Sequence, residues 1–260
     1  AWSCGILGDL LYRGEVVAED KARGRELAKK GCEGGEIDPG CGVYGVALYH
    51  GHGGDQDLPL ARKILKQACD AKHGPSCRIL GVMWVKGLGG KQNEVRAIVM
   101  QQRACEANDR DGCYIAGQMW EGGQAGKKSR HKADQYYNEG CNRGSTQSCK
   151  RGGDLWYTSA DVKSKARKKG RKFYSTGCLL GDEQCCLDSA RTYWEEGTEE
   201  GLSTAFKLYL VSCKNDKAAE ACMWVGVALR DGMGAAQDEA KGRKILESLC
   251  GGGYQPACGR

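Results

Sequence analysis

The sequence predicts an all-α protein, an αα-hairpin solenoid of about seven stacked units, and three observations point to this fold class. Fifteen of the 16 Cys recur at a fixed spacing, small residues recur at matching positions between them, and large apolar residues are scarce. The chain has 260 residues with 40 Gly, 2 Phe and a hydrophobic fraction of 40%. A single compact core of this length usually holds more large apolar side chains, whereas a one-dimensional stack of small cores needs fewer.

The cysteines form pairs, and each pair has a first and a second member eight or nine positions apart. The first cysteines are Cys32, Cys69, Cys105, Cys141, Cys178, Cys213 and Cys250. The second cysteines follow one another every 36 or 37 residues, at Cys4, Cys41, Cys77, Cys113, Cys149, Cys186, Cys222 and Cys258. An internal period of this length is typical of a repeat architecture, and each unit supplies two helices.

The first helix of each unit begins near the second cysteine. A small residue follows four positions later, at Gly8, Gly45, Gly81, Gly117, Gly153, Ala190 and Gly226. A large residue follows three positions after that, at Leu11, Leu48, Trp84, Trp120, Trp156, Tyr193 and Leu229. The spacing i, i+4, i+7 places all three on one face of a helix. A glycine then ends most of these helices, at Gly14, Gly51, Gly87, Gly123, Gly197 and Gly232.

The second helix of each unit ends at the first cysteine of the next pair. Asp or Asn side chains suited to capping a helix N-terminus precede several of them, at Asp20, Asp57, Asn93 and Asp238. A small residue lies eight positions before the first cysteine, at Gly24, Ala61, Ala97, Ala133, Gly170, Ala205 and Gly242. Small residues on both helices allow the two backbones of a hairpin to approach closely.

The spacing within each cysteine pair spans the end of one helix, a turn and the start of the next helix. A disulfide there joins the exit of one hairpin to the entrance of its neighbour. Closing a loop of this size contributes about 2.5 kcal/mol in the chain-entropy model. Cysteines at this density indicate either disulfides in an oxidising compartment or metal sites in a reducing one. Because there is no Cys-x-x-Cys and His50, His52, His73 and His131 are the only histidines, we expect disulfides, no metal and no cofactor.

These motifs resemble Sel1-like repeats, which are related to TPR repeats, in the disulfide-bridged form of the Helicobacter cysteine-rich proteins. That family pairs cysteines with seven residues between them and places Leu-Gly, then an aromatic residue, then Gly-x-Gly in and after the first helix. The stretches "CRILGVMWVKGLGG" (77–90) and "CMWVGVALRDGMG" (222–234) carry this pattern, with Leu229 at the aromatic position of the second. The resemblance covers essentially the whole chain.

The resemblance implies a right-handed superhelix with a concave groove and a secreted or periplasmic location, with the mitochondrial intermembrane space as the alternative. It also implies seven disulfides, Cys32–Cys41, Cys69–Cys77, Cys105–Cys113, Cys141–Cys149, Cys178–Cys186, Cys213–Cys222 and Cys250–Cys258. Cys178 could pair with Cys185 instead of Cys186, and this alternative stays open. On the favoured register Cys4 and Cys185 remain unpaired.

The chain departs from the pattern at its ends and in its fifth unit. Cys4 is a second cysteine whose partner would precede residue 1, and Cys258 opens a helix that would stop two residues later. We therefore expect residues 1–260 to be one solenoid that is cut within a repeat at both ends. The first helix of the fifth unit, residues 149–163, lacks the Gly-x-Gly exit, and we expect it to be irregular.

Two features of the sequence could carry binding. Trp84, Trp120, Trp156 and Tyr193 recur at the repeat spacing, and such a stripe is either core or a set of groove residues suited to peptide capture. Two basic runs lie one repeat apart, in the expected exit loops. Stacking of the repeats would merge them into one patch for an acidic partner. Alternatively, the acidic loop at 195–200 would neutralise them. The runs are Lys127, Lys128, Arg130 and Lys132, then Lys163, Lys165, Arg167, Lys168 and Lys169.

Catalysis has weak support in the sequence. Ser129-x-x-Lys132 has the spacing of the penicillin-recognising motif, and some relatives are described as binding penicillin or hydrolysing it slowly. The companion Lys-Thr-Gly and Ser-x-Asn elements are absent. The predicted function is therefore an adaptor or scaffold that binds a protein or peptide in its groove, with weak penicillin-binding or beta-lactamase activity as the alternative. The net charge of +6 gives no reason to expect nucleic acid, and no membrane span is evident.

Overall fold

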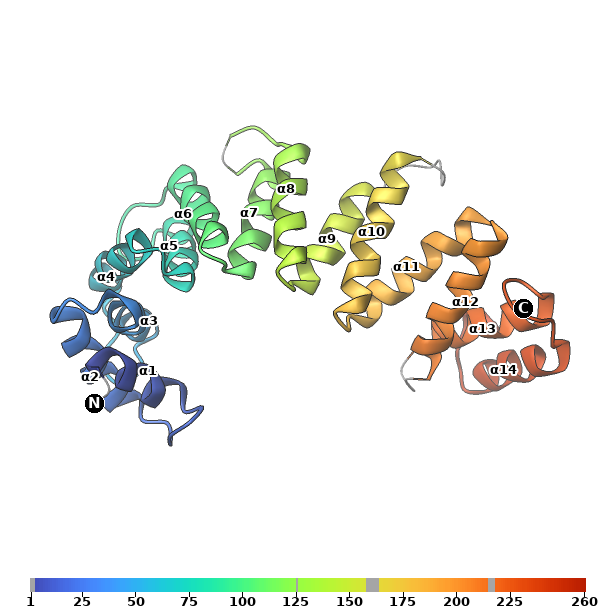
Figure 1. Cartoon of the computed structure of the whole chain (residues 1–260), viewed down its shortest axis with the longest axis horizontal. Helices are drawn as coiled ribbons and strands as arrows, with labels where there is room; N and C mark the ends of the chain where they lie inside the picture. The colour runs from blue at the N-terminus through green and yellow to red at the C-terminus, as the bar shows by residue number, and fades with distance from the viewer. Residues whose placement is uncertain (1–2, 125, 158–163, 215–217) are drawn as a thin grey trace. The chain divides into compact units, whose positions relative to one another are not determined.

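The computed structural model describes residues 3–124, 126–157, 164–214 and 218–260, and within these ranges it is all α-helical with no strand (Figure 1). The first helices of the hairpins are α1 (Cys4–Arg13), α3 (Gly42–His50), α5 (Gly74–Lys86), α7 (Arg110–Gly122), α9 (Thr146–Trp156), α11 (Glu183–Glu196) and α13 (Ala219–Asp231). The second helices are α2 (Lys21–Glu33), α4 (Leu58–Asp70), α6 (Glu94–Glu106), α8 (Arg130–Asn142), α10 (Lys165–Leu179), α12 (Glu199–Cys213) and α14 (Glu239–Gly251). This order confirms the predicted αα-hairpin solenoid.

The chain divides into two compact units, unit 1 (Ala1–Arg143) and unit 2 (Gly144–Arg260). Within each unit, every helix packs mainly on the helices before and after it in the sequence. In unit 1 the first helices α1, α3 and α5 lie on the inner side of an arc and their partners α2, α4 and α6 on the outer side (Figure 1). The first helices therefore line the concave side of unit 1.

The helix boundaries follow from the capping residues that the sequence predicts. Asp20, Asp57, Asn93 and Asp238 each accept a hydrogen bond from the backbone N–H three residues later and start a second helix. The predicted terminal glycines all adopt the left-handed conformation that ends a helix, at Gly14, Gly51, Gly87, Gly123, Gly197 and Gly232. Helix α9 instead ends at Tyr157 with φ −75°, so the fifth unit lacks this cap, as expected.

Close backbone approach explains the recurring small residues in the hairpins. A Cβ on Gly8 would lie 2.6 Å from the Ala28 nitrogen, and one on Gly242 would lie 2.5 Å from the Arg230 nitrogen. Where larger second-helix residues face the glycine, they fill the space themselves, as Leu65 does against Gly45. The core is built largely from Ala, Cys, Leu, Val and Met side chains, with a few buried aromatic residues such as Tyr137 and Tyr209.

The glycine-rich exits of the first helices join neighbouring hairpins. The second glycine of the Gly-x-Gly exit has a positive φ and lies against the start of the preceding second helix, at Gly53, Gly89 and Gly234. A Cβ on Gly89, for example, would lie 2.3 Å from the carbonyl oxygen of Leu58. Both the backbone conformation and the lack of space therefore require glycine there.

Disulfides clip consecutive hairpins together across the short turns. The described pairs are Cys32–Cys41, Cys69–Cys77, Cys105–Cys113, Cys178–Cys186, Cys213–Cys222 and Cys250–Cys258. Cys141 and Cys149 are also disulfide-bonded. Cys178 pairs with Cys186, and Cys185 remains a buried free thiol, whereas Cys4 is an exposed one. In the first pair the sequence separation is 9, and a π-helical turn at Ile37–Cys41 absorbs the additional residue.

Candidate functional site

The four aromatic residues proposed for the groove are half-buried, and each has a cation over its ring. Trp84 and Trp120 pack against a core cluster that contains the buried Ile98 and Met119, and Tyr193 packs against another cluster. The cationic groups lie within 4.7 Å of the ring centroids. The pairs are Arg62 (3.4 Å) and Arg96 (4.7 Å) on Trp84, Lys132 (3.8 Å) on Trp120, Lys169 (4.4 Å) on Trp156 and Arg171 (4.4 Å) on Tyr193. The stripe is thus both core and surface, and its surface is cationic.

The cations come from two fixed positions of the second helices. Arg96, Lys132 and Lys169 each lie nine residues before a first cysteine and cover the aromatic ring of their own hairpin. Arg62 and Arg171 lie seven residues before a first cysteine and cover the ring of the next hairpin. The stacking of these cations on the rings was not predicted from the sequence, although their recurrence relative to the cysteines is a usable signal.

The stack on Trp84 carries two guanidinium groups. Arg62 Nη2 donates to the carbonyl oxygen of Lys91, which holds the exit loop, and no ion pair involves Arg62 or Arg96 among the residues that the structure describes. Partial burial and the nearby Arg96 charge lower the pKa of Arg62. We refer to Arg62, Trp84 and Arg96 as the Trp84 site.

The stack on Tyr193 is neutralised by the protein itself. Arg171 lies over the ring and forms an ion pair with Glu196, the last residue of α11. The adjacent Arg167 stacks on Tyr157 at 3.8 Å, and its Nη2 donates to Glu195 Oε2 at 2.7 Å. We refer to Arg171, Tyr193 and Glu196 as the Tyr193 site. Glu195 and Glu196, the last two residues of α11, therefore neutralise Arg167 and Arg171 of α10, and neutralisation of the whole second basic run stays a prediction.

Most residues of the basic runs lie in second helices, which corrects the expected placement, whereas Lys127 and Lys128 lie in an exit loop as predicted. Ser129 and Ser164 are N-caps whose Oγ atoms accept from the backbone of Lys132 and Arg167, so the helices start earlier than the basic composition suggested. Lys127 and Lys128 precede α8, whereas Arg130 and Lys132 are within it. Lys165, Arg167, Lys168 and Lys169 are in α10, and Lys163 lies outside the described residues.

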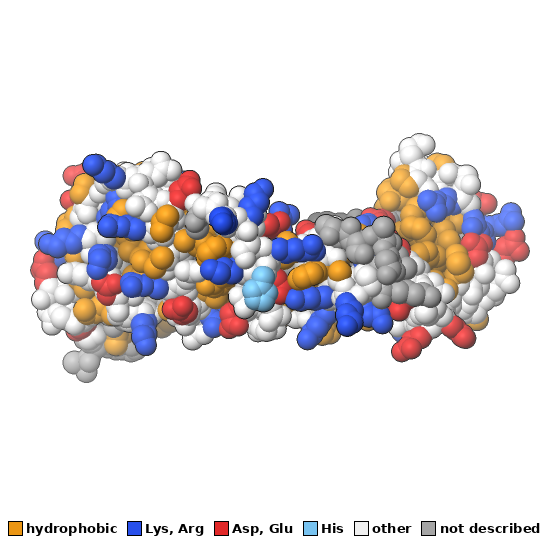
Figure 2. All heavy atoms as spheres, turned by 90° about the horizontal axis from the view of Figure 1, so that it is seen from above, with side chains coloured by type: hydrophobic (Ala, Val, Ile, Leu, Met, Phe, Trp, Pro, Cys, Tyr) orange, Lys and Arg blue, Asp and Glu red, His pale blue; other side chains and the backbone are white. Residues whose placement is uncertain are grey.

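The first run belongs to unit 1 and the second to unit 2, so their merging into one patch stays a prediction. Figure 2 shows one face of the molecule, on which Lys and Arg side chains are interspersed with hydrophobic ones.

Ser129 and Lys132 are both engaged in structural contacts. Ser129 Oγ accepts a hydrogen bond from the backbone nitrogen of Lys132 at 3.3 Å, and Lys132 Nζ lies over Trp120. The motif spacing is therefore that of a helix cap, and this geometry gives no support to acyl chemistry.

A second polar cluster lies in unit 2, on the first helices α9 and α11. Lys150 Nζ is 2.9 Å from Asp154 Oδ1 and 3.1 Å from Asp188 Oδ2, and Tyr174 donates to Asp154. Burial and the Asp154 carboxylate raise the pKa of the Tyr174 hydroxyl. The cluster balances its own charges and acts as a structural network, since each carboxylate has a cationic partner.

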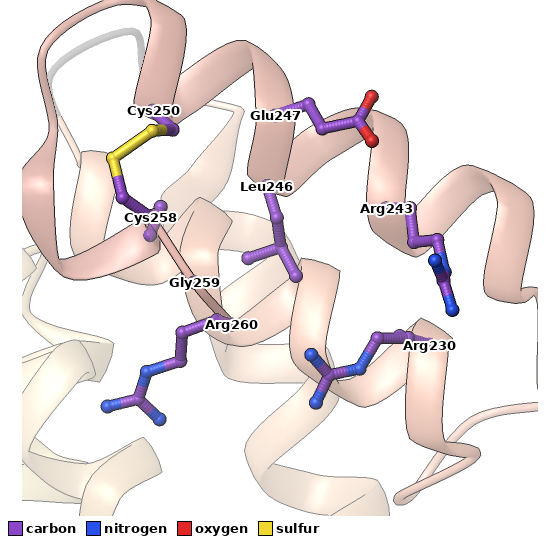
Figure 3. A pocket seen from close by; sticks show the side chains of 9 residues that line it. Arg230, Arg243, Leu246, Glu247, Cys250, Cys258, Gly259 and Arg260 are labelled. Carbon is purple, nitrogen blue, oxygen red and sulfur yellow. A yellow bond between two sulfur atoms is a disulfide. The ribbon is translucent and has the colours of Figure 1, made fainter.

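The pocket at the end of unit 2 has a volume of 570 Å³ (Figure 3). Arg230 and Arg243 line it together with Leu246 and the Cys250–Cys258 disulfide. Arg230 pairs with Asp231 and Arg243 with Glu239, so these guanidinium groups already have carboxylate partners.

No group of metal-ligating side chains occurs in the described ranges, and none of the helices there is long and apolar enough to cross a membrane.

Comparison with known proteins places the chain in a family. The model of the Sel1 repeat matches residues 4–36, 42–73, 74–109 and 219–254, which together exceed half of the chain. The chain belongs to the Sel1 repeat family. Sel1 repeats generally mediate protein interactions, and the disulfides are those of a protein in an oxidising compartment outside the cytoplasm. No curated protein sequence matches the chain.

Two solved repeat structures share the fold. The protective antigen c5321 of uropathogenic Escherichia coli is 21% identical with a TM-score of 0.67, and the match covers 98% of this chain and 54% of that antigen. The Sel1 repeat protein from Oxalobacter formigenes is 18% identical with a TM-score of 0.62, covering 96% of this chain and 97% of that one. Helicobacter pylori cysteine rich protein B is 26% identical over 52% of this chain and 97% of its own, with a TM-score of 0.41.

Proposed function

We propose that this Sel1 repeat protein is a binding scaffold that holds a protein or peptide on the surface formed by its first helices. The observation that carries the proposal is the repeated cation-on-aromatic stack, which places a half-exposed Trp or Tyr and a cation at the same position of successive hairpins. Aromatic and arginine side chains dominate binding energy in protein interfaces. A secreted or periplasmic location fits the disulfides, with the mitochondrial intermembrane space as the alternative.

The stacks suit recognition because their geometry is fixed before a partner arrives. Trp84, Trp120 and Tyr193 pack against core clusters on one side, and each cation is held on a helix. Side chains that are already ordered lose little conformational entropy on binding. Within unit 1, the ordered stacks on Trp84 and Trp120 can therefore select a partner at two positions at once.

Selection of peptides from a random displayed library, followed by affinity measurement, tests the proposal. We expect Trp120→Ala and Lys132→Ala each to weaken the selected peptides about fivefold or more, because both change one stack. Val95→Ala is the matched control, since Val95 is 62% exposed on the second helix α6. Selected peptides that bind both variants as tightly as the parent protein would place the binding surface elsewhere.

A further inference from the structure

We propose that the Trp84 site binds a side-chain carboxylate of an acidic peptide segment. The inference rests on the proposed function and deepens it, since it assigns a chemical class of partner to one position on the binding surface. It depends on a comparison between two equivalent positions of the same chain. One is the Trp84 site in unit 1, and the other is the Tyr193 site in unit 2.

The two sites have the same construction. Arg62 and Arg171 each lie seven residues before a first cysteine, and Trp84 and Tyr193 each lie seven residues after a second cysteine. In both sites the guanidinium comes from the preceding second helix and lies over the ring of the following first helix. The environment of Arg171 therefore shows what such a stacked guanidinium binds.

In the Tyr193 site the ligand of the guanidinium is a carboxylate from the same chain. Glu196 is the last residue of α11 and pairs with Arg171. The last residue of α5 is Lys86, and the residue after it is Gly87, which ends the helix. At the end of α5, unit 1 thus has Lys86 and Gly87, whereas unit 2 has the Glu196 carboxylate at the end of α11. No described acidic side chain of unit 1 therefore takes the place that Glu196 has in unit 2.

The Trp84 site also has more positive charge to neutralise. Arg96 adds a second guanidinium to the indole, whereas the equivalent position next to Tyr193 is Thr204. Neither Arg62 nor Arg96 forms an ion pair with any described carboxylate, and the proximity of the two lowers the pKa of Arg62. Two like charges held on one ring raise the free energy of the unbound protein, and an incoming carboxylate would remove that cost.

The construction favours an acidic peptide over a nucleic acid. Proteins that bind single strands without sequence preference stack bases on exposed aromatic faces, and here Arg62 already covers the indole at 3.4 Å from its centroid. The planar guanidinium can form two parallel hydrogen bonds to a carboxylate, and in the Tyr193 site Arg171 Nη1 pairs with Glu196 Oε2. Two guanidinium groups on Trp84 can accommodate one or two carboxylates of a Glu- or Asp-rich segment.

Fluorescence anisotropy of fluorescein-labelled hexaglutamate, titrated with the whole protein at low ionic strength, tests the proposal. We expect binding that hexaglutamine does not compete, and a loss of about tenfold in affinity for Arg62→Gln and for Arg96→Gln, because each removes a charged hydrogen-bond donor. Arg103→Gln is the matched control, since it removes the same charge from unit 1 at an arginine already paired with Asp70. If Arg103→Gln lowers the affinity for hexaglutamate equally, the losses come from the net charge of the protein and not from the Trp84 site, and the proposal is wrong.

Arg62→Gln also removes the hydrogen bond to Lys91, so a second variant keeps the contacts of the site intact. Lys86→Glu places a carboxylate at the last residue of α5, one position before Gly87, which holds the place of Glu196 in unit 1. We expect this variant to fill its own site and to lose hexaglutamate binding by about tenfold. Lys29→Glu on α2 is the matched charge reversal and should lose much less. Equal losses in the two variants would contradict the proposal, provided that circular dichroism shows both folded.

Two further outcomes are decisive. If single-stranded oligothymidylate binds more tightly than hexaglutamate and depends on Arg62 and Arg96, the site takes phosphates and the peptide proposal is wrong. If the parent protein does not bind hexaglutamate but still binds library-selected peptides through Trp120 and Lys132, this inference fails while the proposed scaffold function stands.

Discussion

At the scale of single residues, Cys185 shows how the repeat constrains side-chain size. It lies directly before a second cysteine, a position that otherwise holds only small residues, Ser3, Gly40, Ser76, Gly112, Ser148, Ala221 and Ala257. Cys185 is fully buried, and a Cβ on Gly177 would lie 2.5 Å from its Sγ. The extra cysteine therefore serves as a small packing residue, and burial together with Asp182 raises the pKa of its thiol.

The first prediction concerns the reactivity of the two free thiols. We expect a thiol-reactive chromogenic disulfide to modify Cys4 rapidly in the native protein and Cys185 only after denaturation, since a buried, protonated thiol is a poor nucleophile. Cys185→Ala should change the free energy of unfolding by about 1 kcal/mol or less, because the volume change is small. Rapid modification of two thiols in the native protein, or severe destabilisation by Cys185→Ala, would contradict the packing role.

Residue identity at equivalent positions also decides which stacks are free to bind. Arg171 and Arg62 occupy the same place relative to their cysteines, but Glu196 neutralises only Arg171. The presence or absence of a glutamate at the end of a first helix thus decides whether the stacked arginine forms an ion pair or remains a cationic surface group. Of these two sites, the Trp84 site is the one whose stacked arginine has no carboxylate partner among the described residues.

At the scale of elements, the exit loops contact neighbouring hairpins and so hold one hairpin against the next. The second glycine of the Gly-x-Gly exit approaches the preceding second helix, and Arg25 and Arg62 donate to carbonyl oxygens of the following exit loops. The loop is therefore held from both sides, and its glycines are needed for contact as well as for the turn.

The second prediction tests this contact. Gly89→Ala introduces a Cβ at φ +68° and 2.3 Å from the Leu58 carbonyl oxygen, and we expect it to lower the free energy of unfolding by about 2 kcal/mol or more. Gly122→Ala is the control, because Gly122 is exposed near the end of α7 and its Cβ would meet only the Gln124 side chain. Alanine there should be neutral or slightly stabilising. Urea denaturation of both variants distinguishes the cases, and equal stabilities would refute the contact.

A cluster of rings joins the exit of α3 to the first hairpin. The rings of His50 and His52 stack with centroids 4.9 Å apart, and Tyr12 Oη lies 2.7 Å from His52 Nδ1. Burial, His52 and Lys21 lower the pKa of His50 below its usual value of 6.5. The neutral imidazole is therefore the form that the folded protein prefers.

The third prediction is the resulting pH dependence. Because the folded pKa of His50 lies below the unfolded one, the unfolded state binds more protons as the pH falls below about 6.5. The stability that this histidine contributes is thus fully present above that pH and is lost as the pH falls through its folded pKa. We expect His50→Gln to make unfolding less dependent on pH between about 4.5 and 6.5, as followed by circular dichroism. His131→Gln, on the exposed start of α8, is the control and should retain the parent profile.

At the scale of the whole molecule, stability comes from many small interfaces. Each hairpin buries a core of modest side chains against its sequence neighbours, and each described disulfide closes a turn with a sequence separation of 8 or 9. Repeat arrays of this kind gain stability approximately as the sum of units and nearest-neighbour interfaces. Covalent clips therefore matter more here than in a domain with one large core.

The fourth prediction follows from that additivity. Replacing both Cys69 and Cys77 by Ala should lower the free energy of unfolding of unit 1 by about 2.5 kcal/mol, the entropy of closing this loop. Cys4→Ala, which removes an exposed free thiol, should leave stability unchanged. Guanidinium titration of the two variants measures the difference. A loss below about 0.5 kcal/mol in the double variant would mean that packing alone joins these hairpins.

Much of the architecture was predictable because the residues that start, end and join the helices recur in every repeat. The cysteine spacing, the capping side chains at Asp57 and Asn93, and the terminal glycines at Gly51 and Gly87 each have a local physical cause that sequence shows directly. The aromatic stripe was also found, but its partners Arg62 and Arg96 were missed. They lie on other helices, 22 and 12 residues away from Trp84 in the sequence, and only packing brings them over the ring.

The sequence by itself determined the hairpins, their boundaries, their number per period and the cysteines that join them, because these depend on interactions within a few residues. Only the tertiary structure decided which cations lie on which rings and which of those cations lack a carboxylate. Those pairings depend on the rotation of one helix against the next, which small residues such as Gly8 and Gly242 set through backbone approach. The chemistry of the surface is therefore a property of the stacked hairpins.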